Sequence, residues 1–421
     1  TTCILADLPG PKLRLGEFPG VKLLNNGDVV RLLCGKMEHD GEEIPVEYDG
    51  LSSDLKTGDS VLVADGLIRL SVKETGGERG TYVDCIVEDG GPVTSRKGIN
   101  LPGTTIDLPA IGEKDKLALD HALKSGADWI AVSYVRSAED LRPAKDAIKA
   151  AGLHTPVIAK IEHPAALENL HSILDAADAV MVARGDLGVE IPLEQVPLAQ
   201  QRIIDAGLMR GMVVIVATQM LESMTLNPRP TRAEVSDVST AIRHGGTAVM
   251  LSGETASGEH PVAAVETMVK IANATEIGLV SSGGTPGALS KFRSTRAVAH
   301  SGVELARMSD AKHILVATQH GNAPRLVAGY RPDVIVTAVT DRKRAARRMN
   351  LLPGVQSVIV EEHERGSKTM QNAIKLLAED GSIKSGDRIV AISGSPQAMS
   401  GATSTVRLYK LQPDGSISGT E

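Results

Sequence analysis

Short apolar runs that end abruptly in polar residues recur through the middle of the chain. Segments with a helical spacing of apolar positions separate them, and the runs cover residues 3–6, 129–135, 157–161, 179–183, 213–217 and 248–252. Such runs are typical of parallel strands that are buried on both faces and joined by helices. The pattern therefore predicts repeated βα units of an α/β barrel, with functional side chains at the carboxyl ends of the strands.

The count of predicted strands falls short of a closed barrel, which has eight. The chain begins at Thr1 rather than at a methionine, and it enters its first apolar run almost at once. We therefore expect a barrel that is incomplete at its amino terminus, with two βα units absent before Thr1.

Two further regions show different patterns. Residues 17–96 contain glycine-rich turns between short alternating runs, which cover residues 28–33, 60–63, 67–72 and 81–87. They predict a small antiparallel β-barrel. After residue 285, helix-like stretches at 293–307 and 367–379 alternate with strand-like runs, which cover residues 313–317, 334–339, 355–360, 388–392 and 406–411. They predict a carboxyl-terminal α/β domain with an open sheet.

The expected fold class is thus α/β, a TIM-type (β/α)8 barrel with an inserted β-barrel domain and a carboxyl-terminal open-sheet domain. We expect the barrel to comprise residues 1–16 and 97–284, the insert residues 17–96, and the last domain residues 285–421. A linker rich in Gly, Ser and Pro is expected at 281–287.

The amino-acid composition indicates how the core is filled, which partners are excluded and which cellular compartment is expected. Apolar residues make up 42% of the chain but aromatic residues only 2%, so aliphatic side chains and alanine must fill the core. A net charge of -7 gives no basic surface of the kind that binds nucleic acid. Three cysteines without metal-ligand spacing indicate a reducing compartment. Because no apolar run reaches 18 residues, we expect no membrane partner and a soluble, cytoplasmic protein.

The apolar run 157–161 carries the first candidate chemistry. Lys160 lies near its end, and Glu162 has the same strand parity, so both side chains are expected on one side. One interpretation is an exposed salt bridge. The other is a cation for a developing anion, beside a carboxylate that binds a metal ion.

The next two strand ends carry similar candidates. Arg184, Gly185 and Asp186 form a predicted strand-to-helix turn, whose free amides suit carboxylate or phosphate oxygens. Asp186 is either a helix N-cap or the second carboxylate of a Mg²⁺ site. Thr218 follows the apolar run 213–217, and it is either a helix cap or a hydroxyl beside the substrate.

An ordered set of motifs resembles the pyruvate kinase family over essentially the whole chain. The motifs are D-L-P-G-P-K-L-R at Asp7, V-A-D-G-L at Val63, K-G-I-N-L-P-G at Lys97, K-I-E at Lys160, A-R-G-D-L-G-V-E-I-P at Ala183, A-T-Q-M-L-E-S-M at Ala217, N-P-R-P-T-R-A-E at Asn227 and L-S-G-E-T-A at Leu251. The resemblance implies phosphoryl transfer from phosphoenolpyruvate to ADP in glycolysis.

The resemblance also assigns roles to the residues singled out above. It implies that Lys160 stabilises the phosphoryl group in flight and that Glu162 and Asp186 bind Mg²⁺ or Mn²⁺. Gly185 and Asp186 would hold the substrate carboxylate, and Thr218 would lie near the enolate where pyruvate gains its proton.

Further roles follow from the first motif and from Lys97. Arg14 and Lys97 match nucleotide-binding positions, and Asp7 with the carbonyl of Leu8 matches part of a monovalent-cation site. Lys12 resembles the lysine of K⁺-independent members, so we expect its ammonium to replace K⁺. The insert 17–96 would be a lid, with Asp65 on its inner side.

The resemblance leaves regulation, assembly and activity open. The run 318–325 lacks both serines of the family's effector loop, so activation by fructose 1,6-bisphosphate is not expected. The basic run 342–348 either binds another phosphorylated effector or forms a solvated helix face. We expect a homotetramer with subunit contacts at 227–234. Two alternatives are a lyase that holds pyruvate enolate on a related barrel, and a catalytically inactive truncated subunit.

Overall fold

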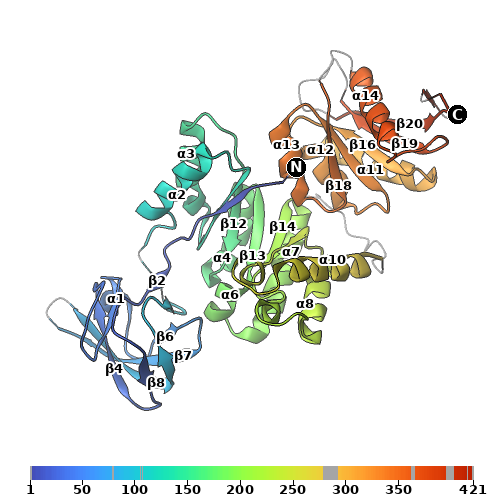
Figure 1. Cartoon of the computed structure of the whole chain (residues 1–421). Coiled ribbons are helices and arrows are strands. Elements are labelled where there is room, and N and C mark those ends of the chain that lie inside the picture. Colours follow the sequence, from blue (N-terminus) through green and yellow to red (C-terminus); the bar gives the residue numbers. More distant parts are fainter. Residues whose placement is uncertain are drawn as a thin grey trace.

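The protein is described by a computed structural model that covers residues 2–419, except 78–79, 105, 107, 278–292, 362–365, 395–402 and 415. The predicted linker 281–287 lies outside the described residues. Three main sheets organise the chain (Figure 1).

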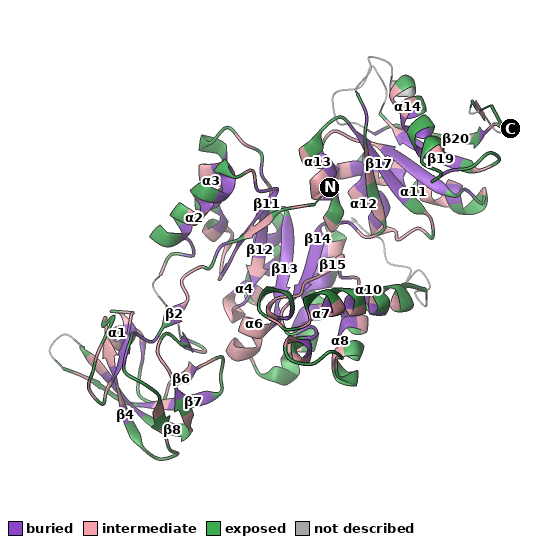
Figure 2. Cartoon of the chain, in the orientation of Figure 1, coloured by how far each residue is buried: buried purple, intermediate pink, exposed green. Residues whose placement is uncertain are grey.

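The central sheet contains the six predicted strands, all parallel and in chain order. They are β1 Leu5–Asp7, β11 Trp129–Val132, β12 Val157–Ile161, β13 Ala179–Ala183, β14 Val213–Ala217 and β15 Ala248–Val249. β13 and β14 are buried along their whole length, which explains their continuous Val, Ile, Met and Ala composition (Figure 2).

Helices and short 3-10 turns connect these strands. They are α2 Glu113–Lys124, η1 Ala138–Leu141, α3 Arg142–Ala150, α4 Pro164–Glu168, α5 Leu170–Ala176, α6 Arg184–Glu190, η2 Leu193–Gln195, α7 Val196–Met209, η3 Glu222–Thr225, α8 Arg232–Arg243, α9 Gly253–Ala256 and α10 Pro261–Ile277. A core of Leu, Ile, Val, Met and Ala side chains joins them to the sheet. None of the helices in the described residues is long and apolar enough to span a membrane.

Two predicted strands proved too long. The run 129–135 leaves the sheet after Val132, because Ser133 and Tyr134 turn to bond the Leu8 carbonyl and the Glu162 carboxylate. The run 248–252 pairs only through Val249.

The insert is a mixed sheet of seven strands with a separate two-stranded ribbon. Its elements are β2 Leu13–Arg14, β3 Lys22–Leu24, β4 Val29–Cys34, β5 Ile44–Val46, α1 Leu51–Asp54, β6 Ser60–Val63, β7 Ile68–Gly76, β8 Tyr82–Asp89, β9 Gly91–Val93 and β10 Gly98–Asn100. Most pairs are antiparallel, as predicted, but β4 and β5 are parallel. β2 and β10 pair where the chain enters and leaves the insert, so both connections are tied together.

The carboxyl-terminal sheet has the order β18-β17-β16-β19-β20-β21, with its last two strands antiparallel to their neighbours. The elements are α11 Arg293–Met308, β16 His313–Ala317, α12 Asn322–Gly329, β17 Ile335–Thr340, α13 Lys343–Arg348, η4 Met349–Leu351, β18 Val355–Ile359, α14 Gly366–Glu379, β19 Arg388–Ser393, β20 Thr405–Leu411 and β21 Ile417–Gly419. This confirms the predicted open α/β sheet.

The carboxyl-terminal unit packs against the base of the central sheet, where the parallel strands begin (Figure 1). One apolar cluster joins Trp129 and Met181 to Met349 and Leu352. Asp128 is fully buried there, and both of its carboxylate oxygens accept bonds from Arg347. The basic run 342–348 is therefore only partly a solvated helix face.

Candidate active site

The carboxyl ends of β1 and β12, with the residues that follow β11, gather around Lys160. Its ammonium lies 3.1 Å from both Asp7 Oδ1 and Glu162 Oε1, and it donates to Ser133 Oγ over 2.7 Å. The Glu162 side chain is only 1% exposed and that of Lys160 11%. The predicted proximity of Lys160 and Glu162 is confirmed, whereas the alternative of an exposed salt bridge is wrong.

Tyr134 joins Glu162 to Asp186, which lies in the first turn of α6. The backbone amide of Tyr134 donates to Glu162 Oε2 over 2.6 Å, and its hydroxyl donates to Asp186 Oδ1 over 3.3 Å. Asp186 is not an N-cap, because α6 begins at Arg184 and the cap position is Ala183. The two predicted carboxylates therefore face one tyrosine from neighbouring elements.

The site concentrates negative charge. Burial raises the pKa of Glu162, and repulsion from Asp186 adds to this, while Lys160 opposes it. Burial also raises the pKa of Glu190, which accepts a bond from Asn100 of the insert. Burial works against the charge of Lys160, yet Glu162 and Asp7 together raise its pKa. The lysine is thus held as a cation among carboxylates.

A cradle of backbone groups forms between α6 and the end of β14. The Gly185 amide donates to Thr218 Oγ1 over 2.6 Å, and that hydroxyl donates to the Ala217 carbonyl over 2.7 Å. A Cβ added to Gly185 would lie 3.2 Å from Thr218 Oγ1, so glycine permits the close approach. Thr218 is not the N-cap of the element that follows it: its φ is +68°, and η3 starts at Glu222.

Arg184 holds the far side of the cradle. Its buried guanidinium donates to the Thr218 carbonyl over 2.8 Å and to the Gln219 carbonyl over 3.3 Å. It also bonds both carboxylate oxygens of Asp237 over 2.7 and 2.6 Å. The fork of Arg184 therefore fixes two residues with positive φ, Thr218 and Gln219.

The insert contributes Asp65 to the site, and the segment that leads into the insert contributes Lys12. Lys12 Nζ lies 3.6 Å from Asp186 Oδ1 and 3.6 Å from Asp65 Oδ1. An added Cβ on Gly66 would lie 3.9 Å from Val189 of α6. This places Asp65 on the inner side of the insert, and it places the Lys12 ammonium beside Asp186.

The residues predicted to bind a monovalent cation and those predicted to bind the nucleotide lie in different parts of the structure. Asp7 faces Lys160, and the Leu8 carbonyl accepts from Ser133 Oγ over 2.6 Å, whereas the ion pairs of Lys12 are with Asp65 and Asp186. Arg14 is exposed, pairs with Gly98 across β2 and β10, and donates to the Arg96 carbonyl over 3.0 Å.

Lys97 is also exposed. It lies on the segment that pairs with the one carrying Arg14, since its carbonyl accepts from the Leu15 amide. The structure therefore places Arg14 and Lys97 on paired backbone segments at the root of the insert. Among the hydrogen bonds and ion pairs of the described residues, none joins Arg14 or Lys97 to Lys160 or Glu162.

Sequence reasoning overlooked several residues of this site. Ser133 and Tyr134 were included in a predicted strand, although their polarity after a buried run was a usable signal. Glu190 lies one helical turn after Asp186, a spacing that places both on one helix face. No local sequence pattern indicates that Arg184 bonds the carbonyls of Thr218 and Gln219 in a distant segment.

The donor set of the site fits a hard divalent cation. Mg²⁺ takes one or two carboxylates and completes its shell with substrate oxygens and water. Burial raises the pKa of Glu162 and repulsion from Asp186 adds to the rise, so a cation between the two carboxylates would oppose both effects. Within the described residues, no group of three or more His, Cys, Asp or Glu side chains could hold a metal ion by itself.

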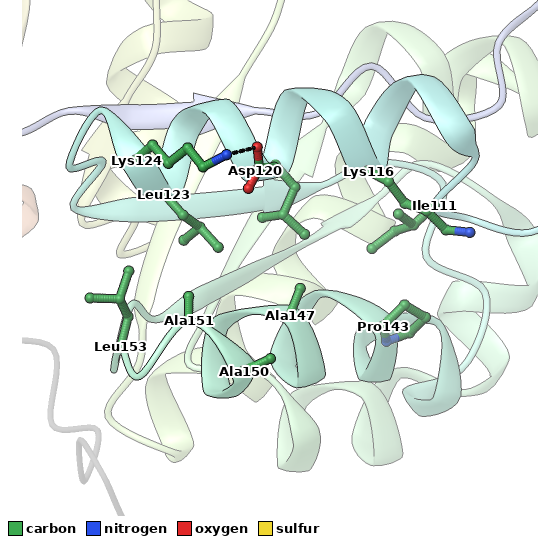
Figure 3. A pocket seen from close by; sticks show the side chains of 11 residues that line it. Ile111, Lys116, Asp120, Leu123, Lys124, Pro143, Ala147, Ala150, Ala151 and Leu153 are labelled. Carbon is green, nitrogen blue, oxygen red and sulfur yellow. Dashed lines mark hydrogen bonds and ion pairs between the residues drawn. The ribbon is translucent and has the colours of Figure 1, made fainter.

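A separate apolar hollow of about 720 Å³ lies between α2 and α3 (Figure 3). Its walls include Leu119, Leu123 and Leu153, and the Lys124–Asp120 ion pair lies at its edge. This hollow contains none of the predicted site residues.

Comparison with known proteins agrees with this geometry. Residues 1–265 match the family described as "Pyruvate kinase, barrel domain", and residues 296–409 match "Pyruvate kinase, alpha/beta domain". The Mycobacterium tuberculosis protein named "Pyruvate kinase" is 40% identical over 413 residues, which are 98% of this chain and 86% of that protein.

Two further relatives extend the comparison. The Geobacillus stearothermophilus protein named "Pyruvate kinase" is 38% identical over 98% of this chain and 70% of its own. A crystal structure of a pyruvate kinase from Cryptosporidium parvum superposes with a TM-score of 0.86 and 34% identity, covering 97% of this chain and 84% of that one. These matches give no support to the expectation of absent βα units.

Proposed function

The chain belongs to the pyruvate kinase family, and we propose that its substrates bind at the carboxyl ends of β1, β12, β13 and β14. Its activity is that of a pyruvate kinase, a phosphotransferase that moves the phosphoryl group of phosphoenolpyruvate to ADP in glycolysis. The observation that supports the proposed location is the cluster of Lys160 with exposed Asp7 and buried Glu162, beside the Gly185–Thr218 cradle.

In this proposal Lys160 neutralises charge on the phosphoryl group during transfer. Phosphoryl transfer demands little covalent chemistry from a protein, so positioning and cationic charge dominate. Ser133 Oγ and two carboxylates hold the Lys160 ammonium in one place, which lowers the reorganisation needed in the transition state.

Glu162 and Asp186 are the residues that would hold Mg²⁺ or Mn²⁺. The family uses a divalent metal, and when bound it would neutralise phosphate oxygens and orient the substrate. Tyr134 orients both carboxylates through its amide and its hydroxyl.

The cradle would bind the organic part of the substrate. The amides in the first turn of α6, at Gly185 and Asp186, suit a carboxylate, which would take the place of the Thr218 hydroxyl at the Gly185 amide. Thr218 Oγ1 would lie beside the enolate carbon and take part in delivering its proton. Asn100 and Lys12 link the insert to α6, and closure of the insert would exclude water that competes for the phosphoryl group.

At the root of the insert, Arg14 and Lys97 would bind the nucleotide phosphates. Both are exposed, both are cationic, and their segments pair directly. We further propose that Lys12 replaces K⁺. Its ammonium already lies 3.6 Å from Asp186, where it supplies the positive charge that a monovalent ion would bring.

The homotetramer and the cytoplasmic location remain proposals. Exposed apolar side chains lie along α10, at Val262, Val265, Val269 and Ile277, and Leu226 in the loop before α8 is exposed as well. Such a patch favours a subunit contact. Cys3, Cys34 and Cys85 are free thiols, as expected in a reducing compartment.

A lactate dehydrogenase-coupled assay with phosphoenolpyruvate, ADP and Mg²⁺ tests the site. Glu162→Gln keeps the size of the side chain but removes its charge, and we expect turnover to fall about 100-fold or more. Glu113→Gln is the matched control, because Glu113 forms only an exposed ion pair with Lys116. Turnover of Glu162→Gln within threefold of the parent would contradict the proposed metal carboxylate.

A further inference from the structure

One face of α6 lies against the insert. Asp186 and Glu190 are four residues apart, a spacing that places them on the same helix face. Asp186 lies 3.6 Å from Lys12, and Glu190 Oε1 accepts from Asn100 Nδ2 over 3.0 Å. Leu187 is fully buried in the core beneath the central sheet. The helix is therefore held between that core on one side and the insert on the other.

The spacing of side chains on β10 matches the spacing on α6. Gly98 and Asn100 are two residues apart, so they lie on the same side of the strand and roughly 6.7 Å from each other. Asp186 and Glu190 are separated by a similar rise along the helix, roughly 6 Å. A Cβ added to Gly98 would lie 2.9 Å from Lys12 Cε, so the glycine leaves room for Lys12 beside Asp186. The strand and the helix thus meet at two matched contacts.

The bond between Asn100 and Glu190 is shielded from water. Asn100 is only 4% exposed, and Oε2 of Glu190 is buried without a hydrogen-bond partner in the part of the chain that the structure describes. Burial raises the pKa of Glu190, repulsion from Asp186 adds to the rise, and the bond from Asn100 opposes it. Loss of this bond would leave a further polar group of a largely buried side chain unpaired, which is costly.

The strand β10 lies next to the residues proposed for the nucleotide. Lys97 directly precedes this strand, and Arg14 pairs with Gly98 within it. Asn100 pairs with Leu62 of β6, so the strand belongs to the insert sheet up to its last residue. A bond from Asn100 to α6 therefore fixes where Arg14 and Lys97 lie relative to that helix.

The helix α6 carries the residues proposed for phosphoenolpyruvate. Its first turn contains Gly185 and Asp186, and the Gly185 amide donates to Thr218 Oγ1. Arg184 ties the same turn to the Thr218 carbonyl. A shift of α6 would therefore move the proposed metal carboxylate and the cradle together.

We propose that Glu190 is a positioning residue that sets the distance between the two bound substrates. Through Asn100 it holds the nucleotide residues of the insert in place over α6, and it does not act on the reacting atoms. Transfer between two bound molecules depends steeply on their separation, and a displacement of about 1 Å can cost about 100-fold in rate. The inference rests on the proposed function, because that proposal places the two substrates beside β10 and α6.

Exchanging the hydrogen-bonding groups of the two residues tests the bond itself. Asn100→Asp places two carboxylates face to face and removes the donor. Adding Glu190→Gln to this variant restores the bond with reversed polarity, because the glutamine amide donates to the aspartate. Glu190→Ala removes the bond outright. Glu194→Ala is the matched control, since Glu194 is an exposed residue of η2 four positions further along.

Hydrogen–deuterium exchange of the full chain, followed by mass spectrometry, reports the contact without any turnover. Amides of α6 should exchange about threefold or more faster in Asn100→Asp and in Glu190→Ala, because the helix loses a tertiary contact. The Asn100→Asp/Glu190→Gln variant should return to the exchange rate of the parent, and Glu194→Ala should not depart from it. Peptides that cover β13 serve as an internal reference in every variant.

Steady-state assays and calorimetry then test the positioning role. We expect kcat to fall about tenfold or more in Asn100→Asp and in Glu190→Ala, and to be largely regained in Asn100→Asp/Glu190→Gln. The dissociation constants of phosphoenolpyruvate with Mg²⁺ and of ADP, each measured alone, should stay within about threefold of the parent. A purely structural role would not separate kcat from these two affinities.

Three results would overturn the proposal. One is exchange of α6 at the parent rate in both Asn100→Asp and Glu190→Ala. Another is an Asn100→Asp/Glu190→Gln variant that is no closer to the parent than Asn100→Asp. The third is a loss of affinity for either substrate alone as large as the loss of kcat. The expected exchange rates together with an inactive parent would instead locate the failure in the proposed function.

Discussion

Replacing Lys160 with methionine is the sharpest test of how the site works. Methionine keeps an unbranched side chain of similar length but removes an ammonium held 3.1 Å from Asp7, 3.1 Å from Glu162 and 2.7 Å from Ser133. Removing one preorganised electrostatic contact lowers turnover by a factor of about 10² to 10³, and removing a cationic group that contacts a transferred phosphoryl group lowers it by about 10³ to 10⁵. We expect kcat to fall at least about 1000-fold.

The same change should destabilise the fold in a pH-dependent way. Breaking a buried ion pair costs about 3–5 kcal/mol, and Glu162 is 1% exposed. Burial raises the pKa of Glu162 to about 7 in the parent, even though Lys160 opposes the shift. The folded chain therefore binds more protons than the unfolded chain above the ordinary pKa of about 4.3, so stability falls as pH rises through this window.

Without Lys160 the pKa of Glu162 rises further, and this loss of stability extends beyond pH 7. Lys160 itself has a raised pKa, so its own contribution is complete below about pH 10.5 and constant over the range tested. The unfolding free energies of parent and variant should therefore diverge increasingly above about pH 7, by up to about 1.4 kcal/mol per pH unit.

Steady-state turnover and urea unfolding from pH 5 to 9, the latter in metal-free buffer, measure both effects. Lys116→Met is the matched control, because Lys116 forms only an exposed pair with Glu113 and should change neither quantity appreciably. A kcat within tenfold of the parent would refute the charge-neutralising role of Lys160. Parallel unfolding curves above pH 7 would refute the electrostatic coupling to Glu162.

Three further changes test other parts of the structure. In Arg184→Lys, the lysine cannot bond Asp237 and the Thr218 carbonyl at the same time, so steady-state assays should show kcat reduced about 10- to 100-fold. An unchanged kcat would mean that Arg184 does not position the cradle. Lys12→Glu should make turnover depend on K⁺ over Na⁺ by tenfold or more at fixed ionic strength, whereas a tenfold dependence already present in the parent would contradict the replacement of K⁺ by Lys12. Asp128→Asn leaves Arg347 without its counterion, and urea unfolding should show a loss of about 3 kcal/mol; a loss below about 1 kcal/mol would mean that this ion pair does not secure the carboxyl-terminal unit.

The sequence predicted the strands best where burial is uniform. The runs 157–161, 179–183, 213–217 and 313–317 coincide with β12, β13, β14 and β16. Each of these runs is mainly apolar and is followed by a polar or turn-forming residue, so the pattern defines its end. The run 129–135 failed because it continues through Ser133 and Tyr134, whose backbone direction depends on contacts with Leu8 and Glu162.

The candidate site was predicted in part for the same reason. Strand parity placed Lys160 and Glu162 on one side, and the order of the strands placed Asp186 and Thr218 nearby. Burial could not be predicted from the local motif, because it depends on how neighbouring strands cover the pair. The family resemblance, rather than the local pattern, distinguished phosphoryl transfer from lyase chemistry, and the family matches support that distinction.

Backbone conformation explains why the cradle could not be predicted from local sequence patterns. Tyr134, Thr218 and Gln219 all have positive φ, and none is glycine. Each such residue costs about 1–3 kcal/mol and persists only where surrounding contacts impose it. Here the Tyr134 amide is held by Glu162, and the carbonyls of Thr218 and Gln219 are held by Arg184. The strain therefore lies at the strand ends that carry the chemistry, and long-range bonds to two charged side chains offset it. The same bonds aim the Tyr134 hydroxyl at Asp186 and the Thr218 hydroxyl at Gly185, so the contacts that stabilise an unfavourable backbone also preorganise the site.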